Sequence, residues 1–121
     1  MNGNDIVIVS ATRTAIGKFG GQFATTSAIE LGTAVAKSAI QKAKLSPEQI
    51  DTVIFGNVLQ AGLGQNPARQ VGLQAGLLHS STALTVNEVC GSGLKAIILA
   101  AQSLRLGDAK IVLAGGMENM S

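Results

Sequence analysis

The residue with the clearest chemical potential is Cys90, the only cysteine among the 121 residues. It follows a run predicted to be a strand, at 83–86, and precedes a run predicted to be a helix. Helix starts offer unpaired N–H groups and the positive end of the helix dipole, which favour the nucleophilic thiolate. Gly91 and Gly93 leave room beside the sulfur for an acyl group, and the Cys90 N–H could donate to an oxyanion. Cys90 is therefore a candidate nucleophile for acyl transfer.

Two other interpretations of this segment stay open. A free cysteine is often only a small buried packing residue. From the residues alone, a packing role and a nucleophilic role for Cys90 are about equally favoured. Gly91-x-Gly93-x-x-Ala96 also matches the dinucleotide-binding pattern, with Glu118 placed like a ribose-binding acid. Against this pattern, two strands precede the unit, four residues separate strand from glycine, and Glu118 follows a glycine pair. A dinucleotide-binding module is the alternative function.

The elements around Cys90 predict an α/β fold. Apolar runs typical of buried strands occur at 6–9, 52–55, 83–86 and 110–114. Between them, Ser27 to Glu30 forms a capping box, Ser46-Pro47 opens a short turn, and Asn66-Pro67 begins a helix to about Leu77. Gly107 ends the helix after Cys90. Strands alternating with helices imply four strands of a mainly parallel sheet, with helices on both faces.

The helix after Cys90 is apolar on nearly every face, since only Lys95 and Arg105 within 94–106 are charged. Such a helix is predicted to be buried all round. The whole chain is 46% hydrophobic and 13% charged, which leaves little polar surface for a small domain. We therefore expect the chain to bury surface against something outside it. Its end at Ser121, just after a strand, indicates a fragment.

Composition excludes several classes of protein. The hydrophobicity excludes a disordered chain, and the single cysteine excludes a disulfide scaffold. Net charge is +2, and the nine basic residues are scattered without an aromatic platform, which disfavours nucleic acid as a partner. Residues 1–5 show no secretory signal, and the longest apolar run, 96–101, is too short to span a membrane. We expect a cytoplasmic protein with a reduced thiol and neither membrane partner nor metal.

Four segments extend this interpretation through the whole chain. Residues 10–17, 56–70, 87–94 and 115–121 read SATRTAIG, GNVLQAGLGQNPARQ, NEVCGSGL and GGMENMS. In this order they resemble the signatures of the thiolase family, of the acetyl-CoA acetyltransferase (acetoacetyl-CoA thiolase) type. A lone G-x-G would be weak, whereas four ordered signatures are specific.

The resemblance implies a layered thiolase fold, in which residues 1–121 form an incomplete N-terminal domain. The rest of that domain and the whole C-terminal domain would be absent. It also implies a ping-pong Claisen condensation, in which Cys90 takes an acetyl group from acetyl-CoA and a second acetyl-CoA attacks the thioester. The reverse reaction is thiolysis of a 3-ketoacyl-CoA. Coenzyme A thioesters would be substrates, with no permanently bound cofactor, and the full-length form would be a homodimer or homotetramer.

The family also uses groups that lie far downstream: an activating histidine, a second cysteine that serves as acid and base, and an asparagine-bearing oxyanion loop. The isolated segment is therefore expected to be inactive. His79, the only histidine, matches none of those motifs and is expected in a solvated turn. Substrate contacts cannot be assigned to residues of this chain. A non-catalytic structural or regulatory role is a third hypothesis.

Four further residues are given structural roles. Asn87 is expected to support the Cys90 turn through side chain to backbone hydrogen bonds. Arg69 is assigned to a surface or interface ion pair, and by the resemblance residues 65–70 lie near the dimer interface. Met117 and Met120 are assigned to packing.

Overall fold

The computed structural model describes residues 4–121. Three of the residues 1–5, which are predicted to form no secretory signal, therefore lie outside the described residues. The α/β prediction is confirmed, with three strands in the sheet rather than four. The elements are α1 (Ala28–Lys42), the 3₁₀ helix η1 (Pro47–Gln49), β1 (Thr52–Gly56), α2 (Pro67–Gln74), β2 (Thr82–Val86), α3 (Ser92–Leu106) and β3 (Val112–Gly116).

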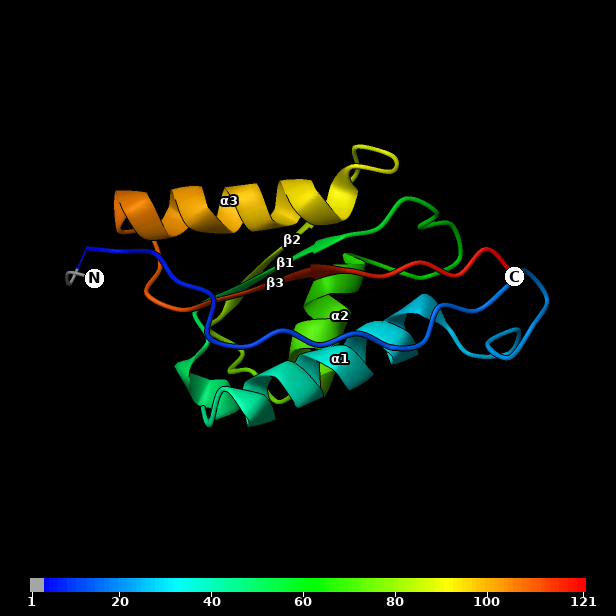
Figure 1. Cartoon of the computed structure of the whole chain (residues 1–121), viewed down its shortest axis with the longest axis horizontal. Coiled ribbons are helices and arrows are strands. Elements are labelled where there is room, and N and C mark those ends of the chain that lie inside the picture. Colours follow the sequence, from blue (N-terminus) through cyan, green and yellow to red (C-terminus); the bar gives the residue numbers. More distant parts are fainter. Residues whose placement is uncertain (1–3) are drawn as a thin grey trace.

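The sheet is parallel throughout, in the order β2-β1-β3. Thr52 pairs with Thr82 on one side and with Val112 on the other, and the register continues without a break to the strand ends. Helix α3 covers one face of the sheet, while α1 and α2 lie on the opposite face (Figure 1). All three strands therefore deliver their following loops to the same carboxyl edge.

The central strand explains where the core lies. Val53, Ile54 and Phe55 are only 1–3% exposed, as expected of a β-branched and aromatic run covered on both faces. The core between the sheet and helices α1 and α2 is the larger one. It contains Ile29, Ala36, Ile40, Val53, Phe55, Ala68, Val71, Leu77, Leu113 and Met117. The core under α3 is smaller and is built on Ile54, Ala96 and Ala100.

The helix ends follow the predicted local chemistry. Ser27 Oγ accepts the Glu30 N–H and the Glu30 carboxylate accepts the Ser27 N–H, both at 3.0 Å, so the capping box is confirmed. Helix α2 starts as predicted but ends at Gln74. Gly76, at φ +98°, turns the chain, and the Leu77 N–H donates to the Gly72 carbonyl in a Schellman arrangement.

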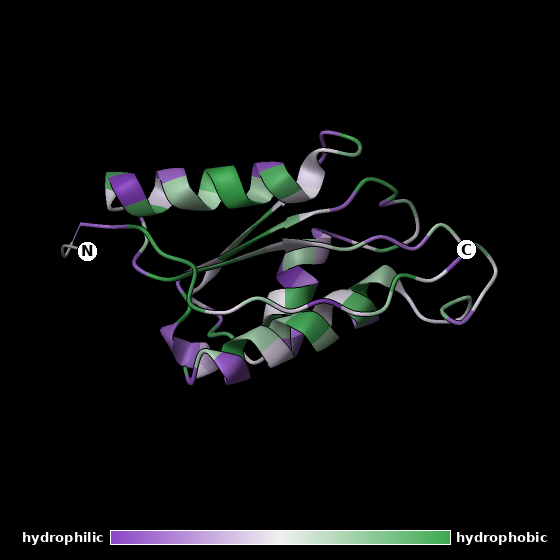
Figure 2. Cartoon of the chain, viewed as in Figure 1, coloured by the Kyte–Doolittle hydropathy of each residue, from purple (hydrophilic) through white to green (hydrophobic). Residues whose placement is uncertain are grey.

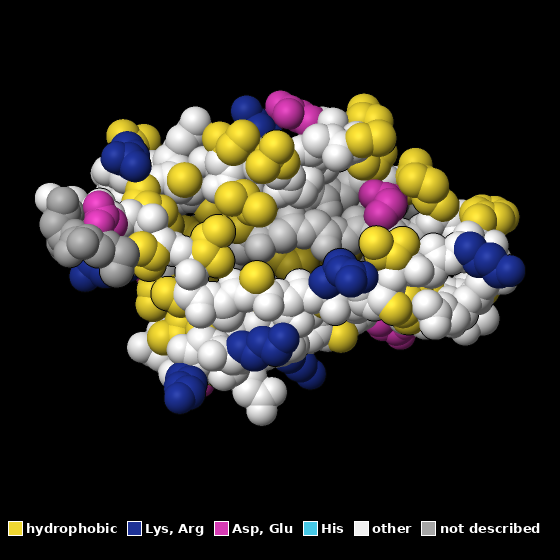
Figure 3. Space-filling view, viewed as in Figure 1, with side chains coloured by type: hydrophobic (Ala, Val, Ile, Leu, Met, Phe, Trp, Pro, Cys, Tyr) yellow, Lys and Arg dark blue, Asp and Glu magenta, His cyan; other side chains and the backbone are white. Residues whose placement is uncertain are grey.

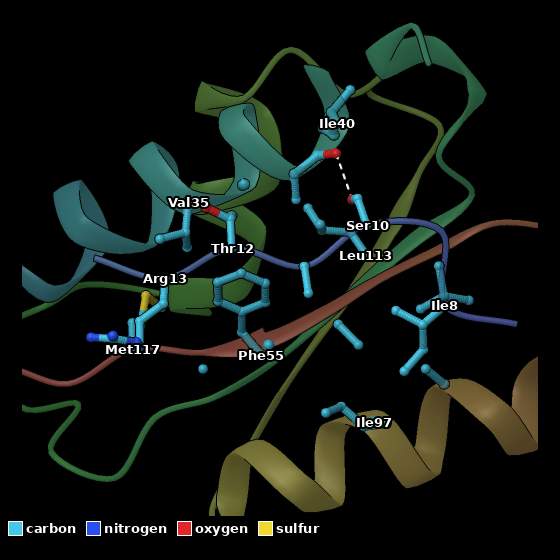
Figure 4. A pocket seen from close by; sticks show the side chains of 18 of the residues that line it. Ile8, Ser10, Thr12, Arg13, Val35, Ile40, Phe55, Ile97, Leu113 and Met117 are labelled. Atoms are coloured by element: carbon cyan, nitrogen blue, oxygen red, sulfur yellow. Dashed lines mark hydrogen bonds between the residues drawn. The ribbon is translucent and has the colours of Figure 1, made fainter. Parts of the chain in front are cut away.

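The N-terminal segment corrects one prediction. Residues 6–9 are extended, as their β-branched side chains favour, but they pair with no strand among the described residues. This segment, β3, α1 and α3 together line a cavity of about 1590 Å³. Figure 4 shows Ser10 and Thr12 turned toward α1 across from Phe55 and Leu113; Ser10 Oγ donates to the Ala39 carbonyl at 2.7 Å. Side-chain bonds to α1, not a ladder, hold the segment.

Helix α3 corrects a second prediction, because within the described chain it is not buried all round. Ala96 and Ala100 pack on the sheet, whereas Leu94 is 66% and Ile97 45% exposed. The described chain covers one side of the helix only, and on the other side large apolar side chains are exposed among polar ones such as Gln102 and Arg105 (Figures 2 and 3). By length and composition alone, Val89–Leu106 could cross a membrane, a test that core helices of soluble proteins also pass.

Asp51 ties the amino-terminal edge of the sheet together. Its carboxylate accepts the N–H groups of Lys110 at 2.7 Å and Ile111 at 3.1 Å, and these bonds lower the pKa of Asp51 below its ordinary value. A carboxyl whose pKa is lower in the folded than in the unfolded state stabilises the fold at neutral pH. That contribution is complete above about pH 4 and disappears as the pH falls through the folded pKa.

We expect Asp51→Asn to lower the melting temperature of the full-length protein at pH 7, with a difference that narrows steadily below about pH 4. Thermal unfolding followed across this pH range measures the effect. Asp108→Asn is the matched control. Asp108 is exposed in the same region, and within the described chain its carboxylate accepts no backbone N–H bond of the kind that Asp51 accepts. A difference that widened in acid would contradict the assignment.

Candidate functional site

Cys90 lies on the turn between β2 and α3, at the carboxyl edge of the sheet. The side chain is free and exposed, so the packing interpretation of this cysteine does not fit the described chain. Gly91 is the N-cap of α3 and provides no side-chain cap. The sulfur therefore precedes the helix start directly, where the sequence places it. Figure 1 shows this turn at the same end of the molecule as the loop after β1 and the C-terminal segment.

The turn is held by side chains on either side of the cysteine. Ser92 Oγ accepts the Glu88 N–H at 2.8 Å and donates to the Val89 carbonyl at 2.7 Å. Asn87 Oδ1 accepts the Val89 N–H at 2.9 Å, which confirms the role predicted for Asn87. The Cys90 N–H takes no part in these bonds. The arrangement fixes the backbone around the sulfur and leaves that N–H outside the turn's own network.

Val89, the residue before the sulfur, is strained. Its φ of +52° lies in the left-handed region, which a β-branched residue rarely adopts. Such a conformation costs about 1–3 kcal/mol and persists only where the surroundings impose it. The bonds from Asn87 and Ser92 to the two sides of Val89 impose it here. Strain of this kind is concentrated at functional sites, because it aims a side chain that a relaxed turn would not.

The charges near the sulfur are few. Glu88 Oε1 lies 3.7 Å from Lys95 Nζ, and with these side chains 57% and 36% exposed the pair contributes little to stability. The first turn of α3 contains no acidic residue that would offset the positive end of its dipole. Among residues 4–121, no three His, Cys, Asp or Glu side chains gather closely enough to hold a metal ion.

Strand β1 and the first turn of α3, which follows Cys90, lie unusually close together. A Cβ on Gly56 would lie 2.6 Å from the Ser92 carbonyl carbon and 2.8 Å from the Gly93 nitrogen. Only a residue without a side chain lets the first turn of α3 come this near. Ser92 is 4% exposed as a result, so its hydroxyl is buried beneath the Cys90 turn.

Two residues considered in the sequence lie away from Cys90. His79 is exposed in the turn before β2, at the amino-terminal edge of the sheet and so at the end opposite the sulfur. Arg69 forms no ion pair in the described chain. Its guanidinium instead donates to the carbonyls of Ser81 at 2.6 Å and His79 at 2.9 Å, which replaces the surface ion pair, while an ion pair at an interface stays a prediction. Met117 packs as predicted, but Met120 is 64% exposed.

Glu118 does not occupy the position of a ribose-binding acid. Its carboxylate accepts backbone N–H groups of the loop after β1, so its acceptor capacity is turned into the protein. The dinucleotide interpretation therefore loses the acid on which it depends. This contact was not predictable from the sequence, because the two segments are about sixty residues apart. The large cavity beside the N-terminal segment does not include Cys90 either.

The site is thus a parallel α/β unit with an exposed cysteine on a strained turn at a helix start, an arrangement that makes the cysteine a candidate nucleophile. The family model "Thiolase, N-terminal domain" matches residues 6–121. The chain belongs to the thiolase family.

Named relatives agree with this assignment. The chain is 61% identical to the acetyl-CoA acetyltransferase of Escherichia coli strain K12, over 95% of this chain and 29% of the relative. It is 56% identical to the cytosolic acetyl-CoA acetyltransferase of Mus musculus, over 96% and 29%. The crystal structure of Acat5 thiolase from Ascaris suum in complex with coenzyme A superposes with a TM-score of 0.89 at 45% identity. That match covers 90% of this chain and 28% of the other. The chain thus spans about three tenths of these relatives.

Proposed function

We propose that the full-length protein is an acyltransferase that forms or cleaves acetoacetyl-CoA through an acyl group carried on Cys90. The observation that carries this proposal is the exposed Cys90 sulfur on its strained, glycine-flanked turn at the start of α3. The names of the relatives support the reaction, and the coenzyme A bound to the Ascaris suum thiolase supports the substrate class.

In the first half-reaction the Cys90 thiolate attacks the carbonyl carbon of acetyl-CoA. The bond from that carbon to the coenzyme A sulfur breaks, and coenzyme A leaves as a thiolate that takes up a proton. Negative charge builds on the carbonyl oxygen during the attack. The Cys90 N–H, which the turn does not use, is a donor for that oxygen.

In the second half-reaction a second acetyl-CoA loses a proton from its methyl carbon, and the resulting carbanion attacks the acetyl thioester. A carbon–carbon bond forms, the bond to the Cys90 sulfur breaks, and acetoacetyl-CoA leaves. Thiolysis is the same sequence in reverse. The bases and acids that move these protons are expected outside residues 1–121, because His79 lies at the far end of the sheet.

The exposed face of α3 supports the further proposal that residues 1–121 are an incomplete N-terminal domain. Burying large apolar side chains stabilises a protein by roughly 1.5–3 kcal/mol each, so a row of them in water is unfavourable. Its most exposed members are Leu94, Ile97, Ile98 and Leu106. We assign this face to the remainder of the full-length protein, which would be a cytoplasmic homodimer or homotetramer. The isolated segment would be inactive.

The nucleophile is tested by mass spectrometry of the full-length protein after mixing with acetyl-CoA. We expect an acetyl thioester on the peptide that contains Cys90, and no adduct on this peptide in Cys90→Ser. An adduct on a different residue, or none while condensation proceeds, would overturn the assignment. Condensation by the isolated residues 1–121 would overturn the proposal that the domain is incomplete.

A further inference from the structure

Glu118, two residues beyond β3, holds the loop that follows β1. Its Oε1 accepts the Val58 N–H at 2.8 Å, and its Oε2 accepts the Leu59 N–H at 3.0 Å. One carboxylate thus binds two successive backbone N–H groups across the carboxyl edge of the sheet. A carboxylate suits this task because both of its oxygens are acceptors, and bonds to an ionised acceptor are about twice as strong as neutral ones.

The platform beneath this contact is rigid. Asn57 is 1% exposed and its Nδ2 donates to the Met117 carbonyl at 3.1 Å, while the Met117 N–H donates to the Gly56 carbonyl at 3.0 Å. Backbone and side-chain bonds therefore join the ends of β1 and β3. With both strand ends fixed, the loop after Asn57 is held by the Glu118 bonds to Val58 and Leu59, together with a bond from Gln60 Nε2 to the Asn57 carbonyl at 2.8 Å.

The same loop reaches the turn that carries Cys90. The Val58 carbonyl accepts a bond from Asn87 Nδ2 at 3.4 Å, and the other end of that amide, Asn87 Oδ1, accepts the Val89 N–H at 2.9 Å. Asn87 itself is exposed, so its amide is oriented by these two bonds, one to the loop and one to Val89. The contacts run from Glu118 through Val58 and Asn87 to the strained residue next to the sulfur.

We propose that Glu118 is a positioning residue for the Cys90 nucleophile: by fixing Val58 it orients Asn87, which holds the left-handed Val89 that aims the sulfur. This inference rests on the proposed acyl transfer through Cys90. It assigns Glu118 no contact with substrate. Its effect is on the geometry of attack, and a misplacement of about 1 Å at a reacting group can cost about 100-fold in rate.

The test is Glu118→Gln in the full-length protein. The amide is nearly the same size but has one acceptor oxygen, so its NH₂ group faces an N–H donor and one of the two loop bonds is lost. We expect the rate of Cys90 acetylation in single turnovers, and kcat, to fall about 10- to 100-fold, while KM for acetyl-CoA changes less than about threefold. If Glu118→Gln lowered the folding stability but left the rate of Cys90 acetylation unchanged, the result would contradict the proposal.

A double-mutant cycle tests the path. Asn87→Ala breaks the link between loop and turn without touching β3, and it should lower the acetylation rate in the same way. Because both changes act through one path, adding Glu118→Gln to Asn87→Ala should cause little further loss. Losses that multiply independently would overturn the proposed path. Should Glu118→Gln fail to fold, an unchanged acetylation rate in Asn87→Ala would still overturn it.

Glu48→Gln is the matched control, because Glu48 is an exposed carboxylate in η1, at the opposite edge of the sheet, and should leave the acetylation rate unchanged. The outcomes separate the two proposals. If wild type forms no adduct on Cys90, the proposed function fails whatever Glu118 does. If Cys90 is acetylated equally fast in wild type and Glu118→Gln, the positioning role fails and the proposed function stands.

Discussion

Replacing Cys90 by serine in the full-length protein is expected to lower kcat for acetoacetyl-CoA formation by at least about 1000-fold. A serine hydroxyl is far less acidic than a thiol, and among residues 4–121 the only histidine lies at the opposite edge of the sheet, too far to act as its base. The variant should fold normally, because the Cys90 side chain is exposed and serine is close to it in size. Steady-state condensation and thiolysis rates measure the loss.

Cys90→Ala provides the second arm of this experiment. If the sulfur is the nucleophile, alanine and serine should be about equally inactive, and both variants should keep the wild-type melting temperature. A serine variant with more than about one tenth of the wild-type rate would point to a group other than Cys90 as the acyl carrier.

Replacing Gly56 by alanine is expected to lower the free energy of unfolding by about 3 kcal/mol, at the upper end of what overpacking normally costs. The added Cβ would lie 2.6 Å from both the carbonyl carbon and the Cβ of Ser92. A backbone atom cannot rotate out of the way as the end of a flexible side chain can, so α3 must move off the sheet. Chemical or thermal denaturation of the full-length protein measures the destabilisation.

Gly93→Ala is the matched control for Gly56→Ala. A Cβ at Gly93 meets nothing within 4 Å, and the residue lies in the first turn of α3. Alanine there should leave stability unchanged or raise it by up to about 1 kcal/mol, because it is the better helix former. Similar losses at Gly56 and Gly93 would show that the close approach of α3 to β1 is not what Gly56 permits.

Local chemistry was predictable because its causes lie within a few residues of one another. The Ser27 and Glu30 capping box, the Asn66-Pro67 helix start and the Gly107 helix end all depend on neighbours along the chain. The Cys90 turn belongs to the same group, since Asn87 lies only three residues from the sulfur. In each of these features the two residues that form a bond lie within a few positions of each other, so both can be recognised in the sequence.

The features that were missed depend on distant partners. Residues 6–9 have the composition of a strand, but a ladder needs an adjacent strand edge, and they line a cavity together with β3 rather than pair with it. The all-round apolar character of α3 indicates burial without saying what covers the helix, and here only the sheet does. Glu118 has the sequence position of a ribose acid, yet the register of β1 and β3 brings it to Val58 instead.

The register of the parallel sheet also has a kinetic consequence. Thr52 pairs with Thr82 and with Val112, so the two ladders join residues 30 and 60 positions apart. Contacts of such long sequence separation are slow to form, because loop closure must precede any stabilising contact. The chain must emerge from the ribosome as far as Glu118 before the loop after β1 can be fixed. Until then the turn that carries Cys90 has only its local bonds from Asn87 and Ser92, without the support of the loop after β1.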